Sequence, residues 1–372
     1  MASLTQLLRE RPPGFGGVER TAHELAQIFN SGDVYCLCNP PDKFDPISVS
    51  YKRWCLHFFS IGRLRIPLPK GHFWALLRSS QPLHGHLPSP AVLVIVLFLH
   101  WLQPQRSFSL HWHAFLQGSA NRVYQFIALL VLRWQQFTVV TTSPVLKEAL
   151  ICSGLHPQQI KVLPCCLSSL GEILSSKQAE LRQQRIYNLD SASSVLHIIC
   201  IGRLDSYKRI DWVIEALALC GTEFKLSVIG DGPDRARLEL LAIESSVEHS
   251  CRFFGQLSEE QKFDLLGTAD LLVLASDNCH EAFGIVQLEA MACGVPSLAL
   301  AFPRSGANWV SALPAMPLWR DPGSVGLAEA LRSFSGDRKL IKLASQQAKD
   351  RYEKLFCRRL WQQQLLSLEL VN

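Results

Sequence analysis

Residues 195–233 read VLHIICIGRLDSYKRIDWVIEALALCGTEFKLSVIGDGP. Residues 195–201 form an apolar, β-branched run that Gly202 closes, which predicts a buried strand. Apolar residues then recur with the spacing i, i+3, i+4 and i+7 of a helix face: Ile210, Val213, Ile214 and Leu217. A second strand is predicted over residues 224–229, and the turn sequence GDGP follows it. A strand, a helix and a second strand in this order predict a parallel sheet that helices cover.

The same alternation continues on both sides of this stretch. Downstream, we expect strands over 252–254, 271–275 and 297–301, and helices over 234–242, 259–266 and 284–293. Upstream, strands are expected over 4–8, 34–37, 91–99, 108–110 and 137–141. A helix between the first two upstream strands is expected to bury Val18, Ala22, Leu25 and Phe29. The sequence therefore predicts an α/β chain with two Rossmann-like halves.

Length and composition support two folded domains. The chain has 372 residues, 48% hydrophobic and 19% charged, a balance that excludes a disordered protein. We expect an N-terminal domain over 1–167, a connection over 168–194 and a C-terminal domain over 195–350. Residues 351–372 are expected to form a helix that returns toward the N-terminal domain.

Several classes of protein are not indicated. The longest apolar run, residues 91–99, is shorter than the roughly 20 residues that a membrane-spanning helix needs. Residues 1–27 carry charges throughout and lack the apolar core of a signal peptide, so a cytoplasmic location is expected. The 12 cysteines lack the spacing of a zinc site, which favours buried reduced thiols.

Charge is concentrated in one segment. Residues 46–147 contain no Asp or Glu but ten Lys and Arg, and aromatic residues accompany them. No nucleic-acid-binding motif occurs with this charge, so we expect no nucleic acid partner. An anionic membrane surface suits a basic, aromatic segment without acids, and a solvated basic face is the alternative.

The sequence also limits how a nucleotide could be bound. It contains no P-loop, and the glycine-rich loop at 14–17 has Glu19 where a dinucleotide fingerprint needs its third glycine. No Asp-x-Asp motif is present, so we expect no metal or other cofactor in the reaction. A bound diphosphate would then be neutralised by side chains and helix N-termini.

Suitable groups lie in the second half. Arg203 and Lys208 stand between a predicted strand and the following helix, where two cations can hold a departing diphosphate. Glu281 opens the loop before the helix expected over 284–293, and Glu289 lies within it. Carboxylates suit sugar diols because they only accept hydrogen bonds. At the start of this helix, the backbone N–H groups of Phe283, Gly284 and Ile285 have no capping partner.

Together these motifs resemble the retaining GT-B glycosyltransferases of family GT4 (group 1), in the mannosyltransferase-like branch of O-antigen and exopolysaccharide assembly. The resemblance rests on motifs in a fixed order: Gly16-Gly17-Val18-Glu19-Arg20, His111-Trp112-His113, Gly202-Arg203-Leu204, Tyr207-Lys208, Gly230-Asp231-Gly232-Pro233, Glu281-x7-Glu289 and Ser305-Gly306-Ala307. It implies two Rossmann-like domains that face each other across a cleft.

The resemblance also implies a role for each site residue. Arg203 and Lys208 would bind the diphosphate of the sugar donor, and Glu289 its ribose. Glu281 would hold the transferred sugar together with the backbone of four residues: Phe283, Gly284, Ile285 and Val286. Gly17 would let the first loop approach the phosphates, and His113 would lie beside the reacting carbon. For His84 and His86 we favour a structural role.

Two departures from the family pattern stand out. Arg209 and Arg304 occupy positions where glycine is usual. Arg209 follows Lys208 and could tilt it, whereas Arg304 could add a cation to the acceptor or phosphate site. Neither change removes a predicted ligand of the sugar donor.

The expected reaction is transfer of a hexose from a nucleotide sugar, with retention, to a saccharide or lipid-linked saccharide in cell-surface polysaccharide biosynthesis. The resemblance favours mannose from GDP-mannose, and a UDP-hexose is the alternative. A lipid-linked acceptor would place the enzyme peripherally on the inner face of the cell membrane. Two other classes stay open: an NAD-dependent sugar epimerase or oxidoreductase, and a non-catalytic binding protein.

Overall fold

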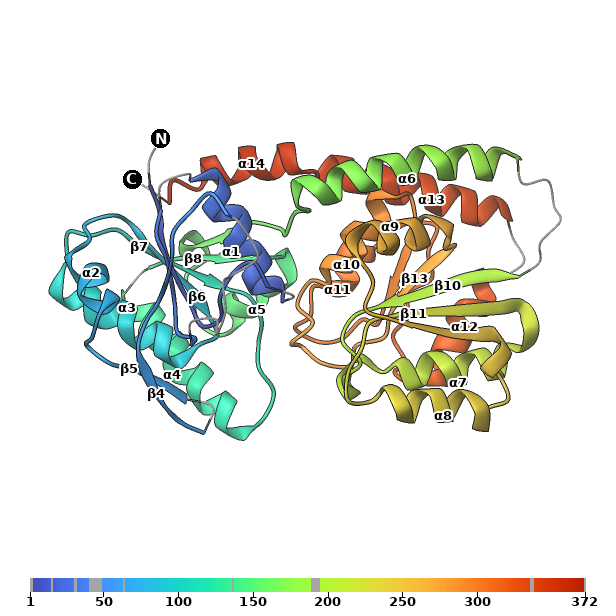
Figure 1. Cartoon of the computed structure of the whole chain (residues 1–372), viewed down its shortest axis with the longest axis horizontal. Coiled ribbons are helices and arrows are strands. Elements are labelled where there is room, and N and C mark those ends of the chain that lie inside the picture. The colour runs from blue at the N-terminus through green and yellow to red at the C-terminus, as the bar shows by residue number, and fades with distance from the viewer. Residues whose placement is uncertain are drawn as a thin grey trace. The chain divides into compact units, whose positions relative to one another are not determined.

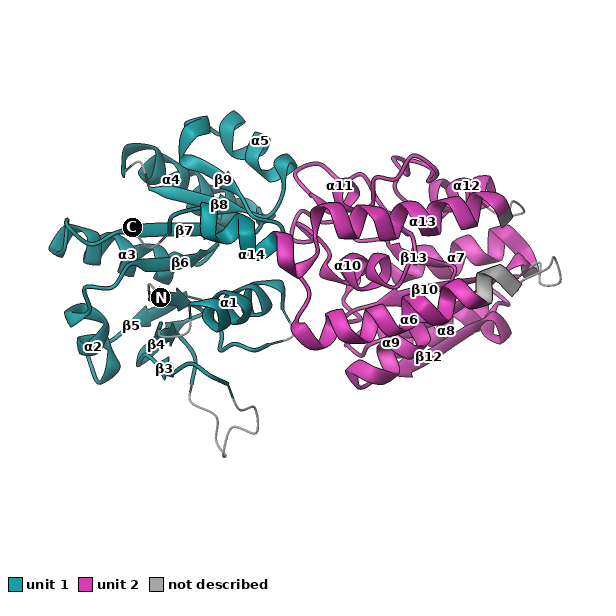
Figure 2. Cartoon of the chain, turned by 90° about the horizontal axis from the view of Figure 1, so that it is seen from above, with its two compact units in different colours: residues 1–165, 361–372 teal, residues 166–360 magenta. Residues whose placement is uncertain are grey.

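The computed structural model describes residues 3–14, 16–29, 32–39, 49–62, 64–135, 137–188, 195–334 and 338–370. The chain divides into two compact units (Figure 2). Unit 1 contains residues 1–165 together with 361–372, and unit 2 contains residues 166–360. Each unit is built around a parallel sheet, as the alternation of strands and helices predicts.

The sheet of unit 1 has seven parallel strands in the order β3-β2-β1-β6-β7-β8-β9 (Figure 1). The chain starts in the middle of the sheet, builds outward to one edge and then returns to build the other, which is the doubly wound topology. The strands are β1 (Thr5–Leu8), β2 (Val34–Cys36), β3 (Arg53–Cys55), β6 (Leu83–Leu87), β7 (Phe108–Trp112), β8 (Thr138–Thr141) and β9 (Ile160–Val162).

Helices and one hairpin complete unit 1. The helices are α1 (Gly17–Ile28), α2 (His72–Arg78), α3 (Pro90–Leu102), α4 (Ser119–Gln135) and α5 (Pro144–Cys152). Strands β4 (Phe58–Ile61) and β5 (Leu64–Pro67) pair with each other as an antiparallel hairpin. Of the predicted helix face in α1, Ala22, Leu25 and Phe29 are buried, whereas Val18 is only half-buried.

The strand predicted over 91–99 is wrong, because these residues form α3. Pro90 occupies the first turn, where its fixed φ and missing N–H suit a helix start. Val92, Val96 and Leu99 are fully buried on one face, while Val94 and Phe98 are exposed. The apolar residues on the exposed face hide the helical period, so the run imitates a buried strand.

Unit 2 agrees more closely with its sequence pattern. Its sheet has five parallel strands in the order β12-β11-β10-β13-β14. They are β10 (Leu196–Ile201), β11 (Phe224–Ile229), β12 (Cys251–Gly255), β13 (Leu271–Leu274) and β14 (Ser297–Ala299). All five predicted strands of this half are confirmed to within two residues at either end.

The helices of unit 2 include the three that were predicted downstream of the opening stretch. They are α6 (Ser169–Asn188), α7 (Ile210–Cys220), α8 (Arg235–Glu244), α9 (Glu259–Thr268), α10 (Ile285–Ala292), α11 (Ala307–Ser311), α12 (Ser324–Phe334) and α13 (Arg338–Leu355). The predicted connection, residues 168–194, therefore contains the long helix α6, which packs against α9 and α10. The last helix, α14 (Arg358–Ser367), spans the boundary between the units at residue 361.

Within the described residues, no helix is both long and apolar enough to cross a bilayer. All 12 cysteines are free thiols.

Candidate functional site

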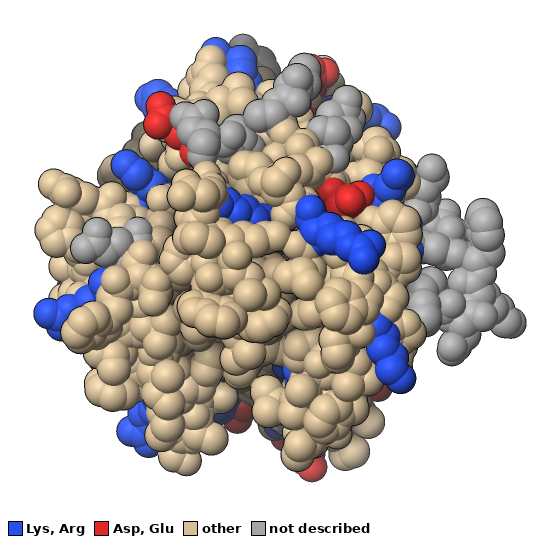
Figure 3. Space-filling model, turned by 90° about the vertical axis from the view of Figure 1, so that its left-hand side faces the viewer, with Lys and Arg blue, Asp and Glu red and all other residues tan. Residues whose placement is uncertain are grey.

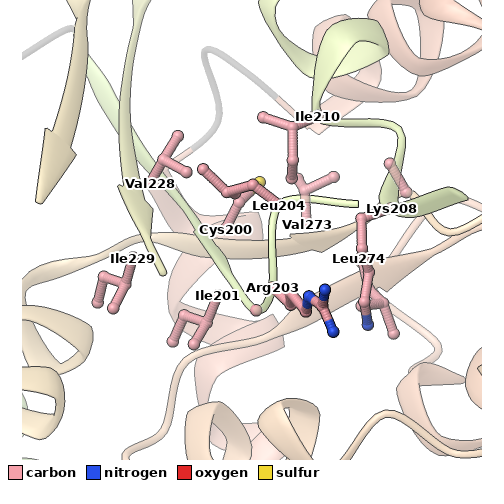
Figure 4. A pocket seen from close by; sticks show the side chains of 12 residues that line it. Cys200, Ile201, Arg203, Leu204, Lys208, Ile210, Val228, Ile229, Val273 and Leu274 are labelled. Carbon is pink, nitrogen blue, oxygen red and sulfur yellow. The ribbon is translucent and has the colours of Figure 1, made fainter. Parts of the chain in front are cut away.

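The first part of the site is the loop at the carboxyl end of β10, where ligands bind in sheets of this type. This loop and the ends of β11 and β13 line a pocket that includes Arg203 and Lys208. Figure 4 shows the nitrogen atoms of both side chains on the same side of the group, away from Cys200 and Val228. Arg203 is 71% exposed and its Nε lies 3.3 Å from an oxygen of Asp205. The two predicted cations therefore lie in one pocket.

Glycines bring a second loop against this one. The N–H of Leu204 donates to the Asp231 carbonyl at 3.0 Å. A Cβ at Gly230 would lie 1.9 Å from the Gly202 carbonyl oxygen, and one at Gly232 would lie 2.5 Å from that of Leu204. Only glycine permits this approach of the two backbones. The GDGP turn thus supports the Arg203 loop.

Lys208 and Glu281 are brought together, although 73 positions separate them in the sequence. The Lys208 Nζ donates a short hydrogen bond to Oε2 of Glu281, and the Ser276 hydroxyl lies 3.4 Å from the same oxygen. Burial acts to lower the pKa of Lys208, but the Glu281 carboxylate and Tyr207 outweigh it, so the pKa is raised. Lys208 is therefore a cation across the physiological pH range.

Arg209 fastens the Lys208 loop to the Glu281 loop. It donates to Asp211 through Nε at 3.1 Å and Nη2 at 2.8 Å, and to Asp277 through Nη1 at 3.1 Å. Its guanidinium carbon lies 4.0 Å from the centre of the Trp212 ring. The N–H of Asp277 also donates to the Tyr207 carbonyl at 3.1 Å. These contacts tie together the two loops that carry Lys208 and Glu281.

The two positions where glycine is usual in the family share one backbone property. Arg209 has φ of 51° and Arg304 has φ of 61°, both in the left-handed region. A side chain there costs about 1 kcal/mol relative to glycine. At Arg209 the bridges to Asp211 and Asp277 offset that strain.

Contacts of Gly284 and Gln287 fix the loop between β13 and α10. Gly284 precedes α10 with φ of 73°, and a Cβ there would lie 2.5 Å from Leu274. Gln287 is fully buried and donates to the carbonyls of Phe283 at 2.8 Å and Ala307 at 3.1 Å. The N-terminus of α10 has no side-chain cap, so its N–H groups can bind an anion or a hydroxyl.

The four loop residues predicted to hold the sugar differ in burial. Phe283 is buried, with Trp309 and Phe356 beside its ring, while Ile285 and Val286 are half-buried. The Ser305 hydroxyl donates to the Glu281 carbonyl and accepts from the N–H of Ala307 at 3.2 Å. The SGA motif therefore supports the Glu281 loop.

Glu289 has a different environment from Glu281. Its carboxylate is buried in α10, and Oε1 lies 2.9 Å from Nζ of Lys262 in α9. Lys262 also pairs with Glu259 at 2.9 Å. The structure thus places Glu289 in an ion pair with a lysine that the sequence analysis did not single out, and its ribose role stays a prediction.

His113 and Gly17 lie in unit 1. His113 follows β7, and its Nε2 lies 2.9 Å from Nδ1 of His86. Burial, followed by the neighbouring His86 and His84, holds the pKa of His113 well below its usual range, so the ring is neutral. Gly17 opens α1 and is exposed, and its carbonyl accepts from the Thr21 hydroxyl at 2.8 Å.

Sequence reasoning missed three residues of the site. Lys262 sits in an ordinary helix with acidic neighbours, so nothing marks it as the partner of Glu289. Asp277 follows an apolar run and Gln287 interrupts one. A polar residue in such a place could have indicated a role in the site.

Comparison with known proteins matches two family models to two parts of the chain. Residues 188–310 match the model for glycosyl transferases group 1, and residues 15–168 match the model for Glycosyltransferase Family 4. The N-acetyl-alpha-D-glucosaminyl L-malate synthase of Bacillus anthracis is 35% identical over 131 residues, 35% of this chain and 33% of that protein. The GDP-mannose-dependent alpha-(1-6)-phosphatidylinositol dimannoside mannosyltransferase of Mycobacterium tuberculosis is 34% identical over 133 residues. The match spans a third of each relative.

Solved structures match over nearly the whole chain. Anabaena Alr3699/HepE in complex with UDP has a TM-score of 0.76 at 17% identity, covering 98% of this chain and 99% of that one. Sucrose-phosphate synthase from Thermosynechococcus elongatus has a TM-score of 0.73 at 20% identity, covering 98% of both chains. The two parallel sheets and these neighbours identify the predicted GT-B fold. The chain is therefore a glycosyltransferase in which a region of the Glycosyltransferase Family 4 model, residues 15–168, is followed by a region of the glycosyl transferases group 1 model, residues 188–310.

Proposed function

We propose that the protein transfers a hexose from a nucleotide sugar to a saccharide or lipid-linked saccharide, with retention of configuration. The observation that carries this proposal is the group formed by Arg203, Lys208 and Glu281 at the carboxyl ends of β10 and β13. It combines two cations with a carboxylate beside the uncapped start of α10. Cations suit a leaving diphosphate, and the carboxylate suits sugar hydroxyls.

In the proposed reaction, Arg203 and Lys208 receive the negative charge that develops as the bond between sugar and diphosphate breaks. Glu281 and the backbone of residues 283–286 hold the sugar, and Glu289 binds the ribose. The leaving phosphate takes the acceptor proton as the new bond forms on the same face. Neutral His113 orients the reacting sugar through hydrogen bonds, and side-chain cations supply the charge that a metal supplies in other transferases.

The decisive test is a transfer assay on purified Glu281→Ala. We expect turnover to fall by about 10²-fold or more, because the sugar loses a hydrogen-bond acceptor in the transition state. Near-normal turnover with every sugar donor would refute the role of Glu281. NMR of the product distinguishes retention from inversion at the anomeric carbon.

For the sugar donor we propose GDP-mannose. The mycobacterial relative, whose name states that it depends on GDP-mannose, is 34% identical over 133 residues. A UDP-hexose is the second candidate, since the similar fold of HepE holds UDP. Thermal shifts with GDP-, UDP- and dTDP-sugars separate the two, and a shift with NAD alone would favour an oxidoreductase.

We also propose that unit 1 binds an anionic membrane, where a lipid-linked acceptor would be found. Its acid-free segment exposes basic residues such as Lys70, Arg122 and Arg133. Large apolar side chains are exposed on α3, α4 and the β4–β5 hairpin: Ile61, Leu64, Val94, Phe98, Trp101, Val123, Phe126, Ile127 and Trp134. Figure 3 shows a face on which residues other than Lys, Arg, Asp and Glu cover most of the surface, with several Lys and Arg side chains among them. Apolar contacts and basic charges together bind interfaces.

Co-sedimentation with vesicles tests this surface. We expect binding to anionic vesicles that weakens at high salt and is reduced further in Trp101→Ser together with Trp134→Ser. Leu240→Ser, which changes an exposed apolar residue in unit 2, is the matched control. Vesicle binding that does not change with lipid charge or salt concentration would contradict the proposal.

A further inference from the structure

The core of unit 1 contains four histidines on two neighbouring strands. His84 and His86 lie on β6, His111 lies on β7 and His113 directly follows it. In the parallel register His86 pairs with His111, so the imidazoles project from the same face of the sheet. All four are buried, and the centroids of neighbouring rings lie 4.0–5.9 Å apart.

Some of these nitrogens have partners. The His84 Nδ1 lies 2.7 Å from the Ser109 hydroxyl, and the His86 Nδ1 lies 2.9 Å from Nε2 of His113. The His86 Nε2 lies 2.9 Å from Oε1 of Gln6, whose amide donates to the Ala22 carbonyl in α1. Both nitrogens of His86 and one nitrogen of His84 therefore have partners within the protein.

Three other nitrogens lack a hydrogen-bond partner within the described part of the chain. They are Nε2 of His84 and both ring nitrogens of His111. Buried polar groups are almost always satisfied, and a fully buried imidazole with neither nitrogen satisfied is unusual. A single bound group that accepts lone pairs from several imidazoles would explain these unsatisfied nitrogens.

The arrangement suits a metal ion. One nitrogen each from His84, His86 and His111 lie within 4.8 Å of one another. Zinc bonds imidazole nitrogen at about 2.0–2.1 Å, so its ligands lie about 3.4 Å apart, which ring rotations can reach here. Neutral imidazole is a preferred ligand of zinc, copper and nickel. The Ser109 contact of His84 is an outer hydrogen bond of the kind that orients metal-bound histidine.

We propose that His84, His86 and His111 bind one divalent transition-metal ion of the zinc class in the core of unit 1. This site involves none of the loops of unit 2 and goes beyond the proposed transfer function, although His113, which that function uses, lies beside it. Cysteine spacing does not indicate this site, because its ligands are histidines that come from two neighbouring strands. His86 has a partner on each ring nitrogen, so metal binding requires its Nδ1 to exchange His113 for the ion while its Nε2 keeps the contact with Gln6.

Because the ligands are buried, the metal would be bound as the chain folds. The first experiment is therefore the metal content of untagged protein purified without chelator, and of protein refolded with Zn²⁺ or Co²⁺. We expect about one metal per chain, and a visible d–d spectrum for Co²⁺ with nitrogen ligands. A metal content below about 0.1 per chain in both preparations, with no Co²⁺ spectrum, would overturn the proposal.

Variants assign the ligands. His84→Gln and His111→Phe should each reduce the metal content at least fivefold. The matched controls should retain it: His197→Asn, which alters a buried histidine bound to Ser227 in unit 2, and His249→Gln, at a side chain that is 93% exposed. Loss of metal in the controls as well would show adventitious binding.

His111→Phe also separates a metal ligand from a structural histidine without any metal analysis. Phenylalanine fills a similar volume but has no ring nitrogens. If His111 binds metal, the substitution lowers the melting temperature, and added Zn²⁺ no longer raises it. If His111 binds nothing, removal of two unsatisfied nitrogens leaves the melting temperature unchanged or raises it, which would refute the proposal.

Discussion

Glu281 and Glu289 each pair with a lysine, but in different surroundings. The side chains of Glu281 and Lys208 are 15% and 16% exposed and lie in loops at the ends of strands. Those of Glu289 and Lys262 are 3% and 7% exposed and lie on two packed helices. Solvent and a ligand reach the first pair more readily, whereas only a few per cent of each side chain in the second pair is open to contact.

The difference in exposure gives the two ion pairs different roles. An accessible pair between loops can exchange partners, so that Lys208 turns to a phosphate while Glu281 turns to sugar hydroxyls. A buried pair loses much more when either partner is removed, because the remaining charge stays without solvent. We therefore expect substitutions at the first pair to affect catalysis and those at the second to affect stability.

The largest effect is expected from Lys208→Met. It removes a cation from the developing diphosphate charge, so kcat should fall by about 10³-fold with a small change in stability. Steady-state transfer assays measure it, and Lys225→Met, on an exposed side chain of β11, is the matched control. A kcat within about twofold of the wild type would exclude Lys208 from the reaction.

The next largest effect tests the buried pair. Lys262→Met removes the lysine that pairs with the Glu289 carboxylate. It should lower the free energy of unfolding by about 3–5 kcal/mol. Urea denaturation measures this loss. The double variant Lys262→Met/Glu289→Met should recover most of it, because two apolar side chains need no partner. Equal stability of Lys208→Met and Lys262→Met would invalidate the comparison between the pairs.

The sequence predicted unit 2 better than unit 1 for a physical reason. In unit 2 the strands β10, β11 and β13 are mostly apolar, and glycine directly follows β10 and β11. In unit 1 the central strand β6 contains His84, Gly85 and His86, which break its apolar pattern, while helix α3 is apolar on its exposed side. Polar residues in a core strand and apolar residues on a surface helix each reverse the usual pattern.

What the sequence can predict of the site is limited in the same way. Arg203, Lys208 and Glu281 could be found because each belongs to a motif next to a strand end. The left-handed backbone at Arg209 and Arg304 agrees with the glycine expected there. By contrast, the partnership of Glu289 with Lys262 depends on how α9 packs on α10, which no local pattern encodes.

A third prediction asks whether Glu289 combines both roles. If its carboxylate binds ribose hydroxyls, Glu289→Gln raises KM for the sugar donor about tenfold with little change in kcat. The wild type should then prefer a ribose donor over its 2′-deoxy analogue, and the variant should lose that preference. An unchanged KM with reduced stability would assign Glu289 to the ion pair alone.

The smallest effect concerns Arg209, which joins the loops of the accessible pair. Arg209→Ala keeps the left-handed strain and loses the bridges to Asp211 and Asp277, so it should be less stable than Arg209→Gly by about 1 kcal/mol. Both should lower kcat by about 5–10-fold, because Lys208 and Glu281 are held less firmly. Ser246→Gly, at another left-handed residue with φ of 57°, is the control and should gain stability without any change in transfer. If Arg209→Gly retains full kcat, the bridges stabilise the fold and do not position the pair.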